Sequence, residues 1–412
     1  MNELVNKILE QATPYNKADF CHVIFGSRYS NKFKIDQTLV LFGAGSAGKE
    51  LLSVIRFHGL DPDCFCDNNA ALAGSHFCGL PVISFNELTE AYKNSLIVIT
   101  TNRYCREILI QLLEAGFDSG QIFTIAHGPL SFYTHIDQWR WSLADLEKNG
   151  EDLLRTYNIL SDVKSKDLFI KRIALFAQGA DYRSFRSFIC EHSDLIAEFG
   201  FTPPCPDEDY ENYMYFNNDL VQLKKNEVYV DVGAYNGDSA EEFIKACISN
   251  QNEYKKIYCL EPDTTNYEQL LSNMARHRDV KCFPLGLWSH ATKLKFESSK
   301  KITEARSARV VEKAGDLEIS ATSLDSLLPN EKITLIKMDI EGAECEALRG
   351  AAETIRKNKP TLVISAYHSR DDIFKIPLIV NEICSDYLLY LRLFSSGFTE
   401  TVLIAVPKLN AD

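Results

Sequence analysis

The sequence lacks the long apolar runs and leader features that would direct it to a membrane or out of the cell. Its longest apolar stretches, SLIVIT and TLVISAY, are far shorter than the roughly 20 residues of a transmembrane helix. The opening residues, MNELVNKILEQATPY, have no basic stretch followed by an apolar one, as a secretory signal would. We therefore expect a cytoplasmic protein with no membrane span.

Positive charge and internal repetition are also scarce. The chain carries 44 Lys and Arg residues against 57 Asp and Glu residues, a formal net charge of -13. Nucleic-acid binding requires a basic surface, so neither DNA nor RNA is an expected partner. Low-complexity segments and solenoid-type repeats are absent. A chain of 412 residues with 45% apolar residues is then expected to form two or three globular domains.

The twelve cysteines include no Cys-x-x-Cys pair, and in a cytoplasmic chain they would be reduced. One cluster of possible metal ligands contains Cys64, Cys66, His76 and Cys78. Zinc sites usually show closer paired spacings, whereas buried thiols act as small core residues. We predict structural thiols and no metal site there.

Two stretches alternate strand-like and helix-like segments, which predicts an α/β protein with two Rossmann-like, doubly wound domains. We expect a helical leader over residues 1–34, a nucleotide-binding domain over 35–127, a helical bridge or cap over 128–226 and a second α/β domain over 227–412. The last two strand-like segments, DYLLYLRLF and ETVLIAVP, are separated only by SSGFT. So short a link predicts a hairpin, and hence one antiparallel strand. The segments TKLKFES and LEISATSL are expected to add a small β-pair.

The second α/β domain opens with EVYVDVGAYNGDS, a strand that ends at an acid and a glycine-rich turn. Gly233 and Gly237 allow a sharp turn and a close approach of the backbone to a ligand. The acids Asp231 and Asp238 would repel a phosphate and favour a cationic ligand. The next strand ends in CLEPD, which places Glu261 to accept hydrogen bonds from two ribose hydroxyls. A ribose together with a cationic tail predicts S-adenosylmethionine (SAM).

These motifs, with LGLWS, TSLDSLL, IKMDIEGAECEALRGAAETI and KPTLVISAYHSRDDIFKIP, resemble the FkbM-type SAM-dependent methyltransferases over residues 213–406. The resemblance implies a seven-stranded class I methyltransferase sheet ending in an antiparallel hairpin, and methylation of hydroxyls on sugars, polysaccharides or polyketides. It implies that Glu261 holds the ribose and that Asp263 and the LGLW turn flank the adenine. Tyr235 stands where the wider methyltransferase pattern has a glycine. The implied cofactor-binding residues are Asp231, Gly233, Ala234, Tyr235, Gly237, Asp238, Ser239, Glu261, Pro262, Asp263, Gly286, Leu287 and Trp288.

Transfer to a hydroxyl requires a group that takes its proton. Four candidates follow the fourth and fifth strands of this domain, namely Lys337, Asp339 and Glu341 in KMDIEGAE and His368 in SAYH. Asp339 and Glu341 could act as general base, bind a divalent cation or orient the amine of SAM. His368 has an ordinary pKa suited to a base, but a structural role is equally open. Glu344 is expected only to place charge in the first turn of the next helix.

The first α/β domain carries FGAGSAG, in which Gly43, Gly45 and Gly48 complete a G-x-G-x-x-G pattern between a strand and a helix. Ser46 opens that helix, and Asp67 ends the next strand, where it could hold a ribose. The following segment, DNNAALAGSHFCGLPVISFNEL, resembles N-terminal domains of bacterial sugar acyltransferases and polysaccharide-biosynthesis enzymes. That resemblance implies a nucleotide or nucleotide-linked sugar. The alternative is that the glycines serve packing alone.

The main hypothesis is a SAM-dependent O-methyltransferase that acts on a small-molecule or carbohydrate acceptor, in a chain that could also form a homo-oligomer. One alternative is an NAD-dependent nucleotide-sugar oxidoreductase that uses the first domain. Another is a non-catalytic nucleotide or SAM sensor of a polysaccharide pathway.

Overall fold

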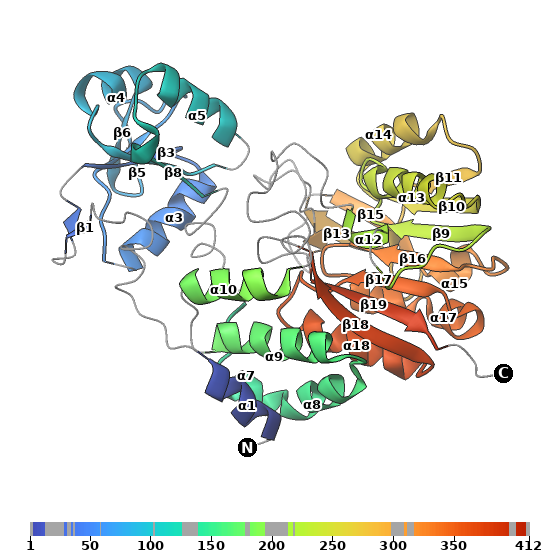
Figure 1. Ribbon diagram of the computed structural model, residues 1–412. Coiled ribbons are helices and arrows are strands. Elements are labelled where there is room, and N and C mark those ends of the chain that lie inside the picture. The colour runs from blue at the N-terminus through green and yellow to red at the C-terminus, as the bar shows by residue number, and fades with distance from the viewer. Residues whose placement is uncertain are drawn as a thin grey trace.

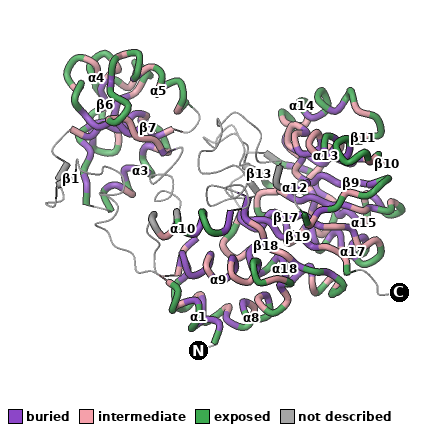
Figure 2. Tube along the Cα trace, in the orientation of Figure 1, coloured by how far each residue is buried: buried purple, intermediate pink, exposed green. Residues whose placement is uncertain are grey.

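The computed structural model describes residues 3–12, 29–30, 34–35, 38–57, 59–101, 104–125, 139–177, 182–193, 213–216, 219–297, 309–310, 317–394 and 401–408. Figure 1 shows two separate α/β units, with a layer of helices packed against the second. In both units the buried residues follow the strands, while the outer faces of the helices are exposed (Figure 2). No described helix is long and apolar enough to cross a membrane.

The N-terminal unit is a six-stranded sheet with the order β5-β6-β4-β3-β7-β8. Apart from the antiparallel strand β5, its neighbouring strands are parallel. All residues of β3 and β7 are buried, as expected for strands covered on both faces. Counted along the chain, the five parallel strands have the order 3-2-1-4-5 of a doubly wound Rossmann-like fold. The elements are β3 (Leu39–Phe42), α3 (Ser46–Phe57), β4 (Cys64–Cys66), β5 (His76–Phe77), β6 (Leu80–Ile83), α4 (Phe85–Ala91), β7 (Leu96–Ile99), α5 (Cys105–Glu114), the 3-10 helix η2 (Ser119–Gln121) and β8 (Ile122–Thr124).

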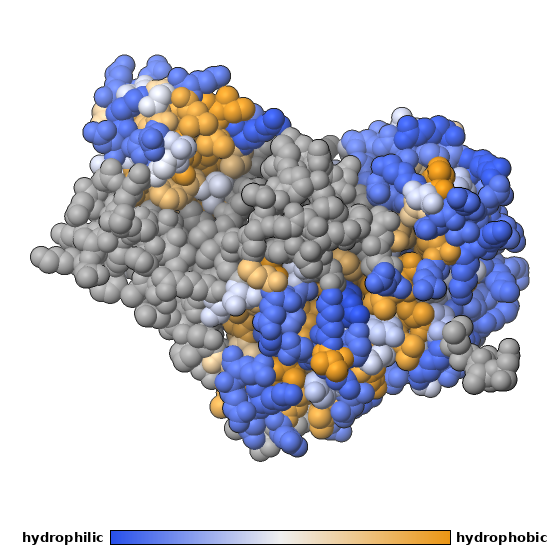
Figure 3. Space-filling view, viewed as in Figure 1, coloured by the Kyte–Doolittle hydropathy of each residue, from blue (hydrophilic) through white to orange (hydrophobic). Residues whose placement is uncertain are grey.

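The cysteine and histidine residues considered as possible metal ligands lie in this unit. Cys64 and Cys66 are buried strand residues, whereas His76 and Cys78 are exposed. Burial raises the pKa of the Cys64 thiol to about 12, as expected for an inert core thiol. Figure 3 shows an apolar area over α5, where Ile110 and Leu113 are exposed.

The helical layer consists of α1 (Glu3–Gln11), α7 (Leu143–Lys148), α8 (Gly150–Ile159), α9 (Val163–Ala177) and α10 (Tyr182–His192). The short helix α12 (Tyr213–Phe216) packs instead on α13 (Asp238–Ser249) of the C-terminal unit. Helix α1 buries Leu4, Val5 and Ile8 and packs on α8 and α9. Its amphipathic face therefore belongs to the helical layer and not to the unit that follows it in sequence. Of the helical leader expected over residues 1–34, α1 is present, whereas β1 (Tyr29–Ser30) and β2 (Lys34–Ile35) pair as antiparallel strands. Residues 13–28 and 31–33 of this leader lie outside the described residues.

The C-terminal unit is a seven-stranded sheet with the order β11-β10-β9-β16-β17-β19-β18, flanked by helices. Strand β19 runs antiparallel to both neighbours, which confirms the predicted hairpin and the class I methyltransferase topology. The strands are β9 (Glu227–Val232), β10 (Tyr254–Leu260), β11 (Val280–Phe283), β16 (Leu335–Met338), β17 (Thr361–Ser365), β18 (Tyr387–Leu393) and β19 (Thr401–Pro407). The helices are α13 (Asp238–Ser249), α14 (Thr264–Met274), α15 (Leu324–Leu327), α16 (Glu344–Arg349), α17 (Ala352–Asn358) and α18 (Asp372–Ile383).

A smaller four-stranded sheet is inserted between β11 and β16. It contains β12 (Gly286–Leu287), β13 (Thr292–Glu297), β14 (Arg309–Val310) and β15 (Leu317–Thr322) in the order β12-β15-β13-β14. The predicted β-pair is present as the antiparallel strands β13 and β15. The LGLW segment, expected as a turn, instead places Gly286 and Leu287 in a strand parallel to β15.

Candidate functional site

The turn that follows β9 is a sharp backbone loop at the carboxyl edge of the sheet. Gly233, Tyr235 and Gly237 all have positive φ angles, of 77°, 47° and 93°. A Cβ atom on Gly233 would lie 1.9 Å from the carbonyl oxygen of Asp339, so the neighbouring strand end leaves room only for glycine. A Cβ atom on Gly237 would lie 2.9 Å from the Cε atom of Met274. The sequence therefore specifies this turn through close packing as well as through backbone conformation.

Asp231 at the end of β9 is fully buried and is paired with Lys337 of the adjacent strand β16. Lys337 Nζ lies 3.1 Å from Asp231 Oδ1 and donates a hydrogen bond to the carbonyl oxygen of Gly233 at 2.8 Å. The hydroxyl of Ser239 donates to Asp231 Oδ2 at 2.6 Å. Burial raises the pKa of Asp231 despite these partners. Its carboxylate thus holds the turn together. The sequence had indicated a free acid facing a ligand, whereas Asp231 is already paired.

Lys337 does not fit the catalytic role expected for it. Burial disfavours its charge, but Asp231 and Asp339 raise the pKa of the ammonium above its ordinary value. A lysine that stays protonated cannot accept a proton from a hydroxyl. Its structural role is to compensate the charge of Asp231.

Glu261 directly follows β10 and is prepared to receive hydrogen-bond donors. Its two carboxylate oxygens accept hydrogen bonds from the backbone N–H groups of Tyr235, at 2.9 Å, and Asp263, at 2.8 Å. Burial raises the pKa of Glu261 to about 7, even though these bonds oppose the shift. Each oxygen keeps a further lone pair, so two additional donors could be accepted.

The neighbouring residues expected around an adenine have structural roles of their own. Asp263 caps α14, because its Oδ1 atom accepts from the N–H groups of Thr265 and Asn266 at 2.9 and 3.0 Å. The N–H group of Trp288 donates to the carbonyl oxygen of Thr322 at 2.8 Å. Of the remaining predicted residues, Ala234 and Leu287 are buried, while Pro262, Asp238 and Gly286 are half-buried.

A second group of polar side chains lies where the parallel strands β16 and β17 end side by side. The Nε2 atom of His368 lies 3.2 Å from Asp339 Oδ1 and 3.6 Å from Glu341 Oε2. The Nδ1 atom of the same ring lies 2.9 Å from Glu344 Oε1. The predicted residues Asp339, Glu341 and His368 are thus brought together, and Glu344 joins them.

The charges of this cluster decide which group can accept a proton. Burial opposes protonation of His368, but Glu344 and Asp339 raise its pKa well above the ordinary value, so the ring is an imidazolium at neutral pH. Burial also acts on Asp339, but hydrogen bonding to His368 and the nearby positive charges hold its pKa well below its usual range. Neither group is a ready base. Glu341, whose φ is 55° and whose side chain is 29% exposed, is the carboxylate of the cluster most open to solvent.

Two residues of this cluster, Tyr215 and Tyr367, were missed from the sequence, and Glu344 was given too small a role. The hydroxyl of Tyr215 donates to Asp339 Oδ2 at 3.0 Å, and that of Tyr367 donates to the same atom at 3.1 Å. Glu344 is buried and accepts from the N–H groups of Ile340 and Gly342 at 2.9 and 3.0 Å, so it does more than charge a helix end. Tyr367 adjoins His368 in the SAYH motif and could have been found, whereas Tyr215 is 124 residues from Asp339 and carries no local signal.

A metal ion has two candidate positions among the described residues. Possible ligand atoms of Asp339, Glu344 and His368 lie within 4.8 Å of one another. A metal there would have to displace the proton that these carboxylates stabilise on His368. A second group contains Asp167, Glu191 and His192, but both of its acids already pair with Lys171, whose ammonium lies 3.0 Å from Asp167.

In the N-terminal unit, two glycines of the G-x-G-x-x-G turn are required by packing. A Cβ on Gly43 would lie 2.5 Å from Thr100 Oγ1, and one on Gly48 would lie 2.2 Å from the carbonyl oxygen of Gly43. Around Gly45, by contrast, an added Cβ would meet nothing within 4 Å. Asp67 accepts hydrogen bonds from the N–H groups of Ala44 and Asn69, each at 2.8 Å. Ser46, the first residue of α3, is exposed beside this turn.

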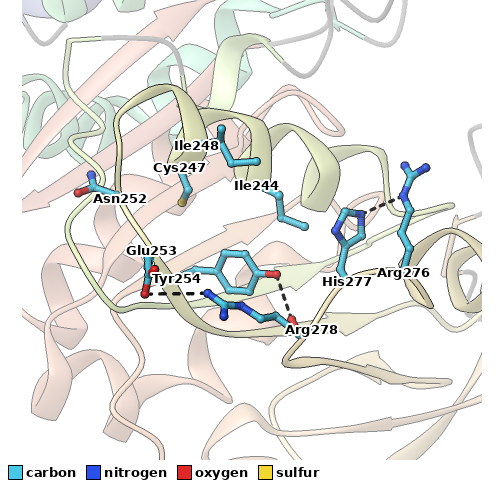
Figure 4. Close-up of a pocket in the computed structure, with 9 residues that line it drawn as sticks. All are labelled: Ile244, Cys247, Ile248, Asn252, Glu253, Tyr254, Arg276, His277 and Arg278. Carbon is cyan, nitrogen blue, oxygen red and sulfur yellow. Dashed lines mark hydrogen bonds and ion pairs between the residues drawn. The ribbon is translucent and has the colours of Figure 1, made fainter.

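A cavity of about 480 Å³ lies at the opposite end of β10 from Glu261. Figure 4 shows residues that line it, in which the side chain of Arg278 runs beside the ring of Tyr254 toward Glu253. Tyr254 is the first residue of β10, whereas Glu261 follows the last. This cavity is therefore distinct from the site at the carboxyl edge of the sheet.

Residues 231–395 match the family model of the methyltransferase FkbM domain. The C-terminal unit is thus an FkbM-type methyltransferase domain. Over 98% of this chain and 99% of the other, the structure is similar to the crystal structure of methyltransferase FkbM from Methylobacillus flagellatus KT, with 19% identity and a TM-score of 0.59. At that identity the likeness concerns the fold, which includes the N-terminal unit and the helical layer.

A partial likeness is found to precorrin-6y C5,15-methyltransferase from Geobacter metallireducens GS-15. It covers 52% of this chain and 95% of the other, with 12% identity and a TM-score of 0.33. The comparison with curated proteins found no matching relative.

Proposed function

We propose that the protein is a SAM-dependent methyltransferase that methylates a hydroxyl group of a sugar, polysaccharide or related natural product. The observation that carries the cofactor assignment is the Glu261 carboxylate. It is buried at the end of β10, fixed by two backbone N–H groups, and has a pKa of about 7 because burial leaves its charge poorly compensated. Two ribose hydroxyls would supply the missing donors.

The cofactor supplies a methyl group that is already activated, so the protein must mainly align the acceptor and remove its proton. SAM bound at this site would supply the methyl group: its carbon–sulfur bond would break as the bond to the acceptor oxygen forms, which leaves S-adenosylhomocysteine. The carboxylate of Glu341 would accept the proton of the hydroxyl group. Glu341 is chosen because Lys337 and His368 are protonated, while donors already surround Asp339.

The first test is calorimetric titration of the full chain with SAM and with S-adenosylhomocysteine. We expect one saturable site in the wild type and a loss of affinity of at least tenfold in Glu261→Ala, because the ribose contacts are lost. Glu241→Ala is the matched control, since Glu241 lies in the same unit but pairs with Arg276 and His277. Wild-type protein that folds but binds neither ligand would refute the proposal. Gly237→Arg is a poor blocking variant because any side chain there would press on Met274.

The second test concerns the base. Transfer of labelled methyl groups to a panel of sugars and polysaccharides should yield a product whose formation is lost in Glu341→Gln, while SAM still binds. Glu346→Gln is the control, because Glu346 lies on α16 and pairs only with the exposed Arg349 among the described ion pairs. Full transfer by Glu341→Gln would exclude Glu341 as the base.

We also propose a second binding site in the N-terminal unit, for a nucleotide or nucleotide-linked sugar. The observation that favours it is the space around Gly45, which packing alone does not explain. Titration with nucleotides and with NAD(H), followed by fluorescence, tests this site and the alternative of an oxidoreductase. Asp67→Ala should change binding there and leave SAM binding unaltered. Methyl transfer to any acceptor would reject the alternative hypothesis that the protein is a non-catalytic nucleotide or SAM sensor.

A further inference from the structure

The helical layer contacts the methyltransferase unit at the turn that carries His368. Arg370, two residues after His368, donates hydrogen bonds from Nη1 and Nη2 to the two carboxylate oxygens of Asp145 on α7, at 2.9 and 2.8 Å. The guanidinium also lies over the ring of Trp141, 5.0 Å from its centre. A forked pair of this kind fixes direction as well as distance, which a single charge contact does not.

Asp145 is itself held in place, so it can act as a fixed anchor. It accepts hydrogen bonds from the N–H group and the hydroxyl of Ser142, at 3.0 and 2.6 Å, which closes the capping box of α7. The hydrogen bonds from Arg370 and Ser142 hold the pKa of Asp145 well below its usual range, so it remains ionised. Trp141 is buried and packs against Phe374 of α18 at 6.0 Å between ring centres.

The same turn also contacts the cluster formed by Asp339, Glu341, Glu344 and His368. His368 contacts Asp339 and Glu344, and the N–H group of Ser369 donates to Asp372 Oδ2 at 2.6 Å. Three consecutive residues therefore make fixed contacts, His368 and Ser369 within the methyltransferase unit and Arg370 with α7. A rotation of the turn that released Arg370 would also move the imidazole.

We propose that Arg370 is a positioning residue: by tying the turn after β17 to Asp145 of α7, it holds the imidazole of His368 against Asp339 and Glu344. This inference rests on the proposed function only where it assigns the cluster around His368 a part in catalysis. The placement of the ring can be measured without turnover. The helical layer is then part of the active site's framework and not only a connection between the two α/β units.

The test uses the full-length protein labelled with 15N-histidine, in which the low-field ring N–H signals of His368 are assigned by their loss in His368→Gln. Arg370→Lys keeps the positive charge but cannot form the fork. We expect its His368 N–H protons to exchange with water at least about tenfold faster than in the wild type, because an imidazole that leaves its carboxylates loses its hydrogen bonds.

The control is Arg155→Lys. Arg155 on α8 forms an ion pair with Glu382 of α18 at 3.1 Å, so it joins the same helical layer to the same unit, but away from His368. Its variant should show wild-type exchange. Asp145→Asn removes the charged partner of Arg370 and should therefore reproduce the effect of Arg370→Lys. It keeps the test valid if the Arg370→Lys protein fails to fold.

Unchanged exchange in a folded Arg370→Lys or Asp145→Asn protein would overturn the proposal. Parallel titration with SAM separates this outcome from failure of the proposed function. Loss of the His368 contacts in variants that still bind SAM would support positioning, whereas a wild type that binds no SAM would refute the cofactor assignment alone.

Discussion

The raised pKa of Glu261 predicts that the affinity for SAM depends on pH. In the free protein its carboxyl group has a pKa of about 7 because it is buried. Ribose hydroxyls donate to the ionised form, so binding favours loss of the proton. The apparent affinity should therefore be greatest above pH 7 and should fall as the pH drops through 7.

The magnitude follows from the fraction of protein that is already ionised. If only the carboxylate binds ribose, a pKa of about 7 makes the apparent Kd about tenfold larger at pH 6 than at pH 8, or about 1.4 kcal/mol. At pH 7 about half a proton should be released for each SAM bound. Calorimetry at pH 6, 7 and 8, in two buffers with different ionisation enthalpies, measures both quantities.

Two variants assign the effect to its source. Glu261→Gln cannot titrate, so it should bind SAM more weakly and with an affinity that varies little between pH 6 and 8. Asp372→Asn should keep the wild-type pH dependence, although burial and Glu344 raise the pKa of Asp372 to about 7 as well. A wild-type Kd that changes by less than about twofold over this range would refute the reasoning about Glu261.

Three further changes have outcomes that the structure specifies. Lys337→Met should lower the free energy of unfolding by about 3–5 kcal/mol, measured by chemical denaturation, because Asp231 is left as an uncompensated buried charge. Gly48→Ala should lower the melting temperature because its Cβ would meet backbone, whereas Gly45→Ala should leave it unchanged; equal melting temperatures would contradict the packing argument. Exhaustive treatment with EDTA should leave SAM binding and methyl transfer intact, because His368 is protonated, and a loss restored by a divalent cation would show the opposite.

The sequence predicted the fold of the methyltransferase unit well because the relevant information is local. Each main strand is a short apolar run, and the positions of Asp231, Glu261, Asp339 and His368 follow from where these runs end. Parallel strands bring such ends to one edge of the sheet. The strand order and the hairpin of β18 and β19 agree with that prediction.

The roles of individual side chains could not be predicted to the same extent, because they depend on partners from distant segments. Lys337 was predicted to be catalytic, but it pairs with Asp231 on the neighbouring strand. Asp263 looked available to a ligand, but it caps the helix that follows it. Tyr215 on α12 reaches Asp339 from 124 residues away in the sequence, and no pattern in the sequence indicates that contact.

The distribution of charge shows how the site could attract a cation even though its most prominent acid is already paired. Around the carboxyl ends of β9 and β16 lie five carboxylates, those of Asp231, Asp238, Asp339, Glu341 and Glu344, and two cations, Lys337 and His368. Five negative and two positive charges leave a formal excess of three negative charges, to which ionised Glu261 adds a fourth. A sulfonium ligand would be stabilised by this excess as a whole, since charges in a partly buried site are only weakly screened. The preference for cationic SAM over the uncharged sulfur of S-adenosylhomocysteine should therefore respond to the sum of these charges. Neutralising the half-buried Glu341 should reduce this preference, measured as the ratio of the two Kd values, without abolishing it.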